Sequence, residues 1–139
     1  MQYSELLCDL FLNLKALYQT NLKIPNASFQ QILAVFLIKD DGVEMSKLSI
    51  QLGIDNSTAT RLIDGLERKN WIKREKDKVD NRIIKVFLTF DGKKIYNSIE
   101  NQLEKIGFLI EEELDLDLRG EIIELGHSLN WAIIKKMSK

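Results

Sequence analysis

Several residue types are scarce in this 139-residue chain, and each scarcity excludes a class of protein. The single cysteine, Cys8, cannot form an internal disulfide, which favours a reducing compartment. One proline and seven glycines exclude a low-complexity or collagen-like chain. No apolar run approaches the ~20 residues of a membrane span, and the amino-terminal residues are acidic where a signal peptide is basic. We therefore expect a cytoplasmic protein without a membrane segment.

Signatures of metal binding and catalysis are missing as well. His127 is the only histidine and Cys8 the only cysteine, so the sequence offers no set of soft ligands for structural zinc. The acidic run at residues 111–117 is more typical of a solvated helix end than of a cation site. No nucleophile with a base, glycine-rich phosphate loop or pair of catalytic carboxylates stands out. We expect neither an enzyme nor a bound cofactor.

The charge is small in total but unevenly distributed. The net charge is −1, and the 45% apolar content is enough for the core of one ordinary domain. Residues 1–60 hold four Lys/Arg and six Asp/Glu, residues 61–94 hold eleven and six, and residues 95–139 hold five and nine. A segment of charge +5 thus lies between flanks of −2 and −4. A local basic patch of this kind favours a partner with a phosphate backbone.

Apolar residues at intervals of three and four predict helices at both ends of the chain. The first covers residues 2–20 and ends before Pro25. A long helix begins with Thr89 as its cap and reaches about Glu113, and a last helix starts at Asp115 or Asp117. These helices carry more apolar surface than a unit of about 60 residues can cover. The excess predicts a homodimer interface built from residues 1–27 and 95–139.

The central residues 28–94 have the pattern of a winged helix-turn-helix. Ser28 or Asn26 caps a helix that is apolar nearly all round and should be central in the core. Ser46 is the expected N-cap of a helix over residues 47–52, and Gly53 permits the turn into the next helix. That helix begins at Asp55 or Asn56, buries Ala59, Leu62, Ile63 and Leu66, and ends near Asn70. Strands at residues 71–74 and 82–88 then enclose a polar turn and form the wing.

Polar residues of this central part are suited to DNA. Ser57, Thr58, Thr60 and Arg61 lie on the exposed face at the helix start, where the helix dipole favours phosphate, although such a face is also an ordinary solvated one. The basic residues of the first strand and turn suit backbone contacts, although some of them only keep the wing soluble. The predicted DNA-contacting residues are Ser46, Asn56, Ser57, Thr58, Thr60, Arg61, Lys73, Arg74, Lys76, Lys78, Asp80, Asn81 and Arg82.

Order and spacing over residues 45–92 resemble the MarR family of bacterial winged-helix transcriptional regulators. The resemblance implies a mainly α fold with a small β-hairpin wing (α+β), with dimerisation helices from both termini in one domain of residues 1–139. It also implies a dimer on double-stranded DNA, with a recognition helix in each major groove and Arg82, oriented by Asp80, in the minor groove. The elements that carry it are Leu48-Ser49, Leu52-Gly53-Ile54, Ser57 to Glu67, Trp71-Ile72-Lys73-Arg74, Asp80-Asn81-Arg82 and Leu88-Thr89-Phe90-Asp91-Gly92.

The chain departs from this family in two places. Asn81 stands where the family often has a second arginine, which weakens one expected wing contact. Asn70 precedes Trp71 where glycine is usual, and asparagine tolerates the left-handed conformation that such a turn needs. The bulk of Trp71 has no explanation in the sequence.

Three alternatives remain at this level. The acidic flanks and Asn81 are compatible with a winged helix that binds protein instead of DNA. Cys8 lies where one subgroup of the family senses hydroperoxides, although a small buried side chain at the dimer interface is the commoner outcome. Trp131, Phe108 and Tyr96 either line a cavity for a small-molecule effector or belong to the core. Arg82 and Asp80 have a plain alternative too, a surface ion pair of little energetic value.

Overall fold

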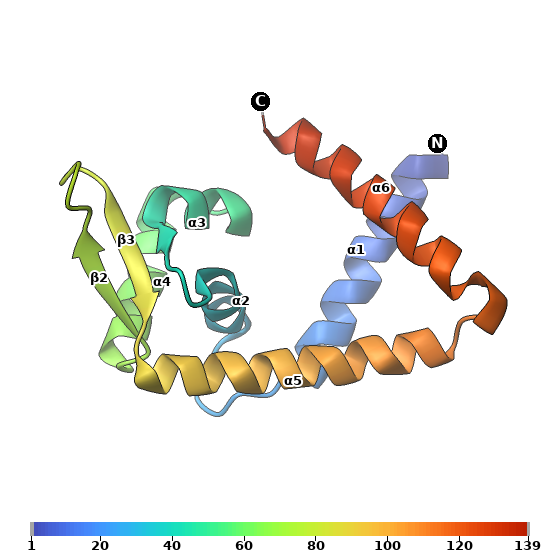
Figure 1. Cartoon of the computed structure of the whole chain (residues 1–139), viewed down its shortest axis with the longest axis horizontal. Coiled ribbons are helices and arrows are strands. Elements are labelled where there is room, and N and C mark those ends of the chain that lie inside the picture. The colour runs from blue at the N-terminus through green and yellow to red at the C-terminus, as the bar shows by residue number, and fades with distance from the viewer. Residues whose placement is uncertain (1, 139) are drawn as a thin grey trace. The chain divides into compact units, whose positions relative to one another are not determined.

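The computed structural model describes residues 2–138 and is mainly helical with a small antiparallel sheet (Figure 1). This agrees with the predicted fold class. The chain divides into two compact units, with the boundary between Leu103 and Glu104 inside α5. In chain order the elements are α1 (Gln2–Asn21), α2 (Phe29–Ile38), β1 (Val43–Glu44), α3 (Met45–Leu52), α4 (Asn56–Arg68), β2 (Ile72–Lys76), β3 (Ile84–Leu88), α5 (Phe90–Glu112) and α6 (Arg119–Met137), with a short 3-10 turn at Leu116–Leu118.

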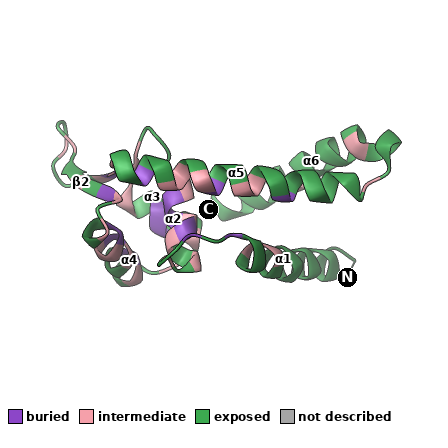
Figure 2. Cartoon of the chain, turned by 90° about the horizontal axis from the view of Figure 1, so that it is seen from below, coloured by how far each residue is buried: buried purple, intermediate pink, exposed green. Residues whose placement is uncertain are grey.

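The core of the first unit is built around α2, as its all-round apolar sequence predicts. Buried residues lie on α2, on the inner faces of α3 and α4, and on the strands (Figure 2). The connector after α1 is fixed by Gln102 of α5, whose Oε1 accepts from the Lys23 amide at 2.7 Å. Its Nε2 donates to the Lys23 carbonyl at 3.0 Å. The core residues with the least exposure are Ala34, Val35, Ile38, Leu48, Ile63, Leu66, Val86 and Ile99.

Side-chain caps set where the helices begin. Ser28, and not Asn26, caps α2 in a reciprocal pair: its Oγ accepts from the Gln31 amide at 3.2 Å and its amide donates to Gln31 Oε1 at 3.1 Å. Thr89 caps α5 by accepting from the Gly92 amide at 3.0 Å. The expected Ser46 cap is wrong, because α3 begins at Met45 and Ser46 already lies in its first turn. The pairing of β1 keeps the chain extended up to Glu44, so the helix starts earlier than Ser46 permits.

The sheet has the strand order β1-β3-β2, and both pairings are antiparallel. Strands β2 and β3 form the wing hairpin with Arg74 opposite Val86 and Lys76 opposite Ile84. Both predicted wing strands exist, shifted toward Ile72–Lys76 and Ile84–Leu88. Strand β1 was not predicted, since two residues are too short to show an alternating pattern.

The junction of α4, the wing and α5 explains the unusual Asn70-Trp71 pair in part. Asn70 adopts φ 63°, the left-handed conformation expected of it. The Trp71 carbonyl accepts from the Thr89 amide at 3.0 Å and lies so near Gly92 that a Cβ there would be 1.9 Å from its oxygen. The Trp71 ring is half-buried with the Lys69 ammonium 5.1 Å from its centroid. Glycine at position 92 is therefore required by the close approach of the α5 start to the Trp71 carbonyl.

The second unit contains the end of α5, the 3-10 turn and α6. Its last helix begins at Arg119 and not at Asp115 or Asp117, because residues 116–118 first make the tighter 3-10 turn. Arg119 Nε donates to the Leu114 carbonyl at 3.2 Å and closes this corner. Among the described residues of α6 none is buried within the single chain. No helix in residues 2–138 is long and apolar enough to span a bilayer.

Candidate nucleic-acid interface

The start of α4 is organised by one carboxylate. Asp55 Oδ1 accepts from the Thr58 amide at 2.7 Å and from Ser57 Oγ at 2.9 Å. These bonds, the backbone one first, lower the pKa of Asp55 to about 2. Asp55 is thus the cap that the sequence left open between two candidates. The Thr58 amide is already occupied, so a phosphate at this helix start would have to use other donors.

The exposed face of α4 presents Ser57, Thr60 and Arg61, while Thr58 is half-buried. Thr60 Oγ1 donates to the Asn56 carbonyl at 2.9 Å, and Arg61 Nη2 lies 3.5 Å from Thr58 Oγ1. Arg61 is exposed and extends beyond the first turn of the helix. Short hydroxyls beside one arginine are side chains that can contact base edges and phosphates from a single helix face.

A buried serine joins the two helices of the helix-turn-helix. Ser49 Oγ donates to the Ser46 carbonyl at 2.9 Å and lies 3.1 Å from Asn56 Oδ1. The Asn56 side chain is therefore tied to α3, whereas the Ser46 side chain is exposed. The sequence had assigned both residues to DNA and gave Ser49 only a packing role. A small residue between two closely crossing helices was the available signal for this contact.

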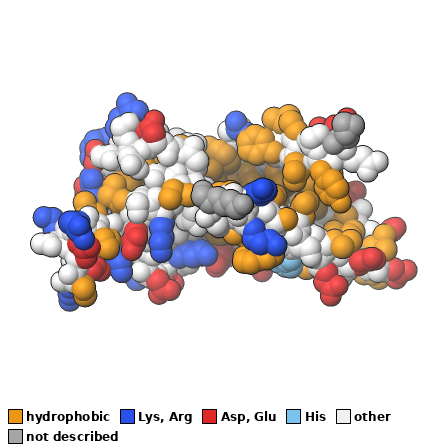
Figure 3. Space-filling model, turned by 90° about the horizontal axis from the view of Figure 1, so that it is seen from above, with side chains coloured by type: hydrophobic (Ala, Val, Ile, Leu, Met, Phe, Trp, Pro, Cys, Tyr) orange, Lys and Arg blue, Asp and Glu red, His pale blue; other side chains and the backbone are white. Residues whose placement is uncertain are grey.

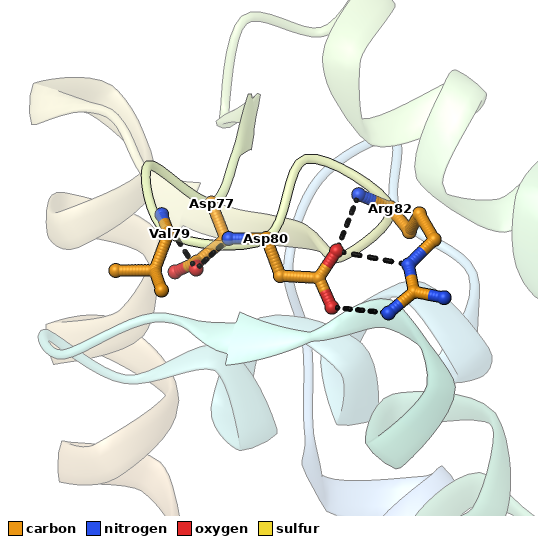
Figure 4. A network of polar contacts seen from close by, with 4 residues as sticks. All are labelled: Asp77, Val79, Asp80 and Arg82. Carbon is orange, nitrogen blue, oxygen red and sulfur yellow. Dashed lines mark hydrogen bonds and ion pairs between the residues drawn. The ribbon is translucent and has the colours of Figure 1, made fainter.

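Carboxylates shape the tip of the wing (Figure 4). Asp77 Oδ2 accepts from the amides of Val79 and Asp80 at 3.1 and 3.0 Å and closes the turn. Asp80 Oδ1 and Oδ2 each accept from the Arg82 guanidinium at 3.0 Å, and Oδ1 also accepts from the Arg82 amide. Hydrogen bonds, from the Asp80 amide to Asp77 and from Arg82 to Asp80, lower the pKa of both carboxyls. The Arg82 side chain is nevertheless 90% exposed.

The remaining wing residues divide into exposed and engaged ones. Lys76, Lys78 and Asn81 are exposed, and Lys73 Nζ lies 3.4 Å from Glu75 in an exposed pair. Arg74 differs from the phosphate contact that the sequence predicted. Its guanidinium is held by two carboxylates of α4, Asp64 and Glu67, which raise its pKa, Glu67 first. The sequence analysis missed these two acids and Asp77, because only the fold brings their partners to them.

Residues considered for sensing lie outside this surface. Cys8 is exposed on α1 in the single chain. Tyr96 stacks on Phe36 in the first unit, with ring centroids 5.8 Å apart, and Phe108 and Trp131 are exposed in the second unit. A different cavity of about 550 Å³ lies in the first unit. Its lining includes Phe11, Leu14, Lys15, Tyr18, Phe29 and Leu33. Within residues 2–138, no group of three or more metal-ligating side chains is brought together.

Comparison with known proteins gives one consistent result. A family model described as "MarR family" matches residues 29–84. The HTH-type transcriptional regulator YybA of Bacillus subtilis, itself uncharacterized, is 27% identical over 116 residues, which cover 79% of this chain and 77% of that protein.

Solved structures share the fold at lower identity. Streptococcus pneumoniae FabT, crystallised in complex with DNA, superposes with a TM-score of 0.74 at 23% identity and covers 99% of this chain and 98% of its own. The regulator PcaV of Streptomyces coelicolor, in complex with its natural ligand, has a TM-score of 0.69 at 18% identity and covers 94% of this chain and 92% of its own. The chain thus belongs to the MarR family of DNA-binding winged-helix transcriptional regulators, a family of regulators and not of enzymes.

Proposed function

We propose that this MarR-family regulator acts as a homodimer on a pseudo-palindromic operator in double-stranded DNA, as a repressor whose affinity responds to a signal. One observation carries the proposal: the exposed polar face of α4 lies beside a basic wing whose tip holds a 90% exposed but rigidly paired arginine, Arg82. Both elements belong to the same compact unit. A single chain therefore presents a helix for a major groove and an arginine for the neighbouring minor groove.

In this account α4 enters the major groove with its first turn. Ser57 and Thr60 reach base edges, and Arg61 contacts a base or the adjacent phosphate. Lys76 and Lys78, which are exposed on the wing, neutralise phosphates without reading sequence. The described wing thus contributes affinity, and α4 contributes most of the base recognition.

Arg82 is the proposed minor-groove residue. Its bidentate pair with Asp80 holds the guanidinium in one orientation before DNA arrives, which lowers the entropy lost on binding. A narrow A·T-rich minor groove concentrates negative potential and attracts such a group. Asn81 beside it is uncharged, so a second charged contact at the tip is absent at this position.

A second copy of the chain is the proposed partner for the terminal helices. Most apolar side chains of α1, of the end of α5 and of α6 are solvent-exposed in the single chain, and uncovered apolar groups are visible in Figure 3. Exposed apolar surface on this scale marks an association interface. A two-fold dimer would place two copies of α4 about one helical turn of DNA apart, roughly 34–36 Å. The most exposed of these side chains are Tyr3, Phe11, Phe108, Leu109, Leu116, Ile123 and Leu125.

A small-molecule effector would fit the cavity beside α1 and α2. Its lining is largely apolar and aromatic, and Lys15 supplies one positive charge, so a small aromatic anion has the matching chemistry. The cavity touches both α1, in the proposed dimer interface, and α2, in the core of the winged helix. A ligand there would thus contact both parts that must hold their spacing on DNA.

The test starts from genomic fragments selected by the chain itself, followed by mobility-shift titration at fixed salt. Arg82→Ala should lower affinity for the selected fragment while sedimentation still reports the wild-type mass. Lys105→Ala, which removes an exposed charge from α5, is the matched control and should bind as wild type does. Equal affinity of Arg82→Ala and wild type would refute the wing assignment. Enrichment of no fragment, with a stable protein partner instead, would favour the protein-interaction alternative.

A further inference from the structure

Three charged side chains meet where the wing contacts α4. Arg74, on β2, donates through Nη2 to Glu67 Oε1 at 2.9 Å and also to Asp64 Oδ1. The Arg74 side chain is 26% exposed, and the acids are 40% and 44% exposed. Arg74 pairs across the hairpin with the buried Val86, so it lies on the inner side of the wing. One guanidinium therefore serves two carboxylates of a neighbouring helix.

The two carboxylates occupy an unexpected face of α4. Residues spaced by three, four and seven share one side of a helix, so Ser57, Arg61 and Asp64 lie in one row. Thr60, Asp64 and Glu67 form a second row beside it. The face proposed to meet DNA thus continues into two negative charges. Uncompensated carboxylates at that place would repel the phosphates that flank the groove.

We propose that Arg74 is a positioning residue that neutralises Asp64 and Glu67, so that α4 can approach the DNA backbone, and that it does not itself bind phosphate. The proposal rests on the DNA-binding function proposed above. Reaching a phosphate would require Arg74 to leave two carboxylates for one anion and to uncover both on the DNA-facing side. The exchange would replace compensated charges with repulsive ones.

Neutral substitutions separate this role from phosphate binding. Arg74→Gln leaves both acids uncovered, whereas the triple variant Arg74→Gln, Asp64→Asn, Glu67→Gln removes all three charges and keeps groups that can hydrogen-bond to one another. Each full-length variant is titrated against the fragment selected by wild type and against a random-sequence duplex of equal length. Titrations at several salt concentrations give the dependence of the binding constant on salt.

The expected results differ between the two variants. Arg74→Gln should bind the selected fragment about tenfold more weakly, because two carboxylates then face phosphates. The triple variant should recover to within about threefold of wild type. Its salt dependence should match that of wild type, since the number of neutralised phosphates is unchanged.

A phosphate contact by Arg74 would give a different pattern. The triple variant would then stay weak, and the slope of log K against log salt would fall in magnitude by about 0.9. That result would overturn the proposal, and so would an Arg74→Gln variant that binds as wild type does. If Arg74→Gln fails to fold, the triple variant alone still decides by its affinity and slope. Failure of the DNA-binding function itself is distinguishable, because wild type would then prefer no fragment over the random duplex.

Discussion

The winged-helix core and the terminal helices solve the burial of apolar side chains in opposite ways. In α2, α3 and α4 the apolar positions are covered by the same chain, and Leu48, Ile63 and Leu66 are each 0% exposed. In α1 and α6 no described residue is buried in the single chain, although both helices have regular apolar periodicity. The difference teaches that periodicity predicts a helix, whereas burial depends on what covers it. The first region folds on its own contacts, and the second requires another surface.

The largest expected effect sharpens this comparison inside one helix. Leu48→Ala should lower the free energy of unfolding by about 2–5 kcal/mol, because a fully buried leucine leaves a cavity in the core. Ile50→Ala, two residues away and 63% exposed, should change it by less than about 0.5 kcal/mol. Denaturant titration of both variants at one protein concentration measures the contrast. Similar losses for the two variants would contradict the burial pattern.

A charge on a terminal helix should break the dimer and leave the winged helix folded. Leu125→Asp should raise the dimer dissociation constant at least about 100-fold, since a carboxylate would be buried in an apolar interface. Sedimentation over a range of concentrations gives the constant, and circular dichroism checks the helix content. Ile50→Asp introduces the same charge at a position of nearly equal exposure, 63% against 62%, but outside the terminal helices. If both variants dissociate equally, the interface does not lie on α6.

A smaller effect is expected at the start of the central helix. Ser28→Ala removes one half of the reciprocal cap with Gln31 and should cost about 1 kcal/mol of unfolding free energy. Gln30→Ala, an exposed neighbour in the same first turn, should be nearly neutral and serves as its control. Thermal or urea unfolding resolves this difference. An unchanged stability for Ser28→Ala would show that the α2 start is held by packing alone.

The smallest effect concerns pH. The pKa of Asp55 is lowered to about 2 in the folded chain, and those of Asp77 and Asp80 are lowered as well. Their contribution to stability is present above an unfolded pKa near 3.8 and is lost as pH falls from there toward 2. Asp55→Asn should therefore flatten the loss of stability below pH 4 and leave its shape near pH 7 unchanged. An identical acid limb for wild type and variant would rule out this cap as a contributor.

Much of the fold follows from local sequence patterns, and the failures have physical causes. The helices, the wing and the left-handed Asn70 are predictable because periodicity and turn chemistry act over a few residues. Strand β1 and the start of α3 are not, because a pairing with β3 some forty residues away decides both. At the site, the exposed Arg82 and Lys78 were found from their motif and charge. The engagement of Arg74 by α4 was not, since only the folded wing brings β2 to that helix.

The number of chains on one operator tests the account most directly, because it joins the self-contained winged helix to the uncovered terminal helices. Mass measurement of the chain on a duplex that contains a single selected site should give two chains of 16.1 kDa per duplex, with Leu125→Asp bound weakly or not at all. One chain per duplex, bound with the affinity of wild type and unaffected by Leu125→Asp, would contradict it.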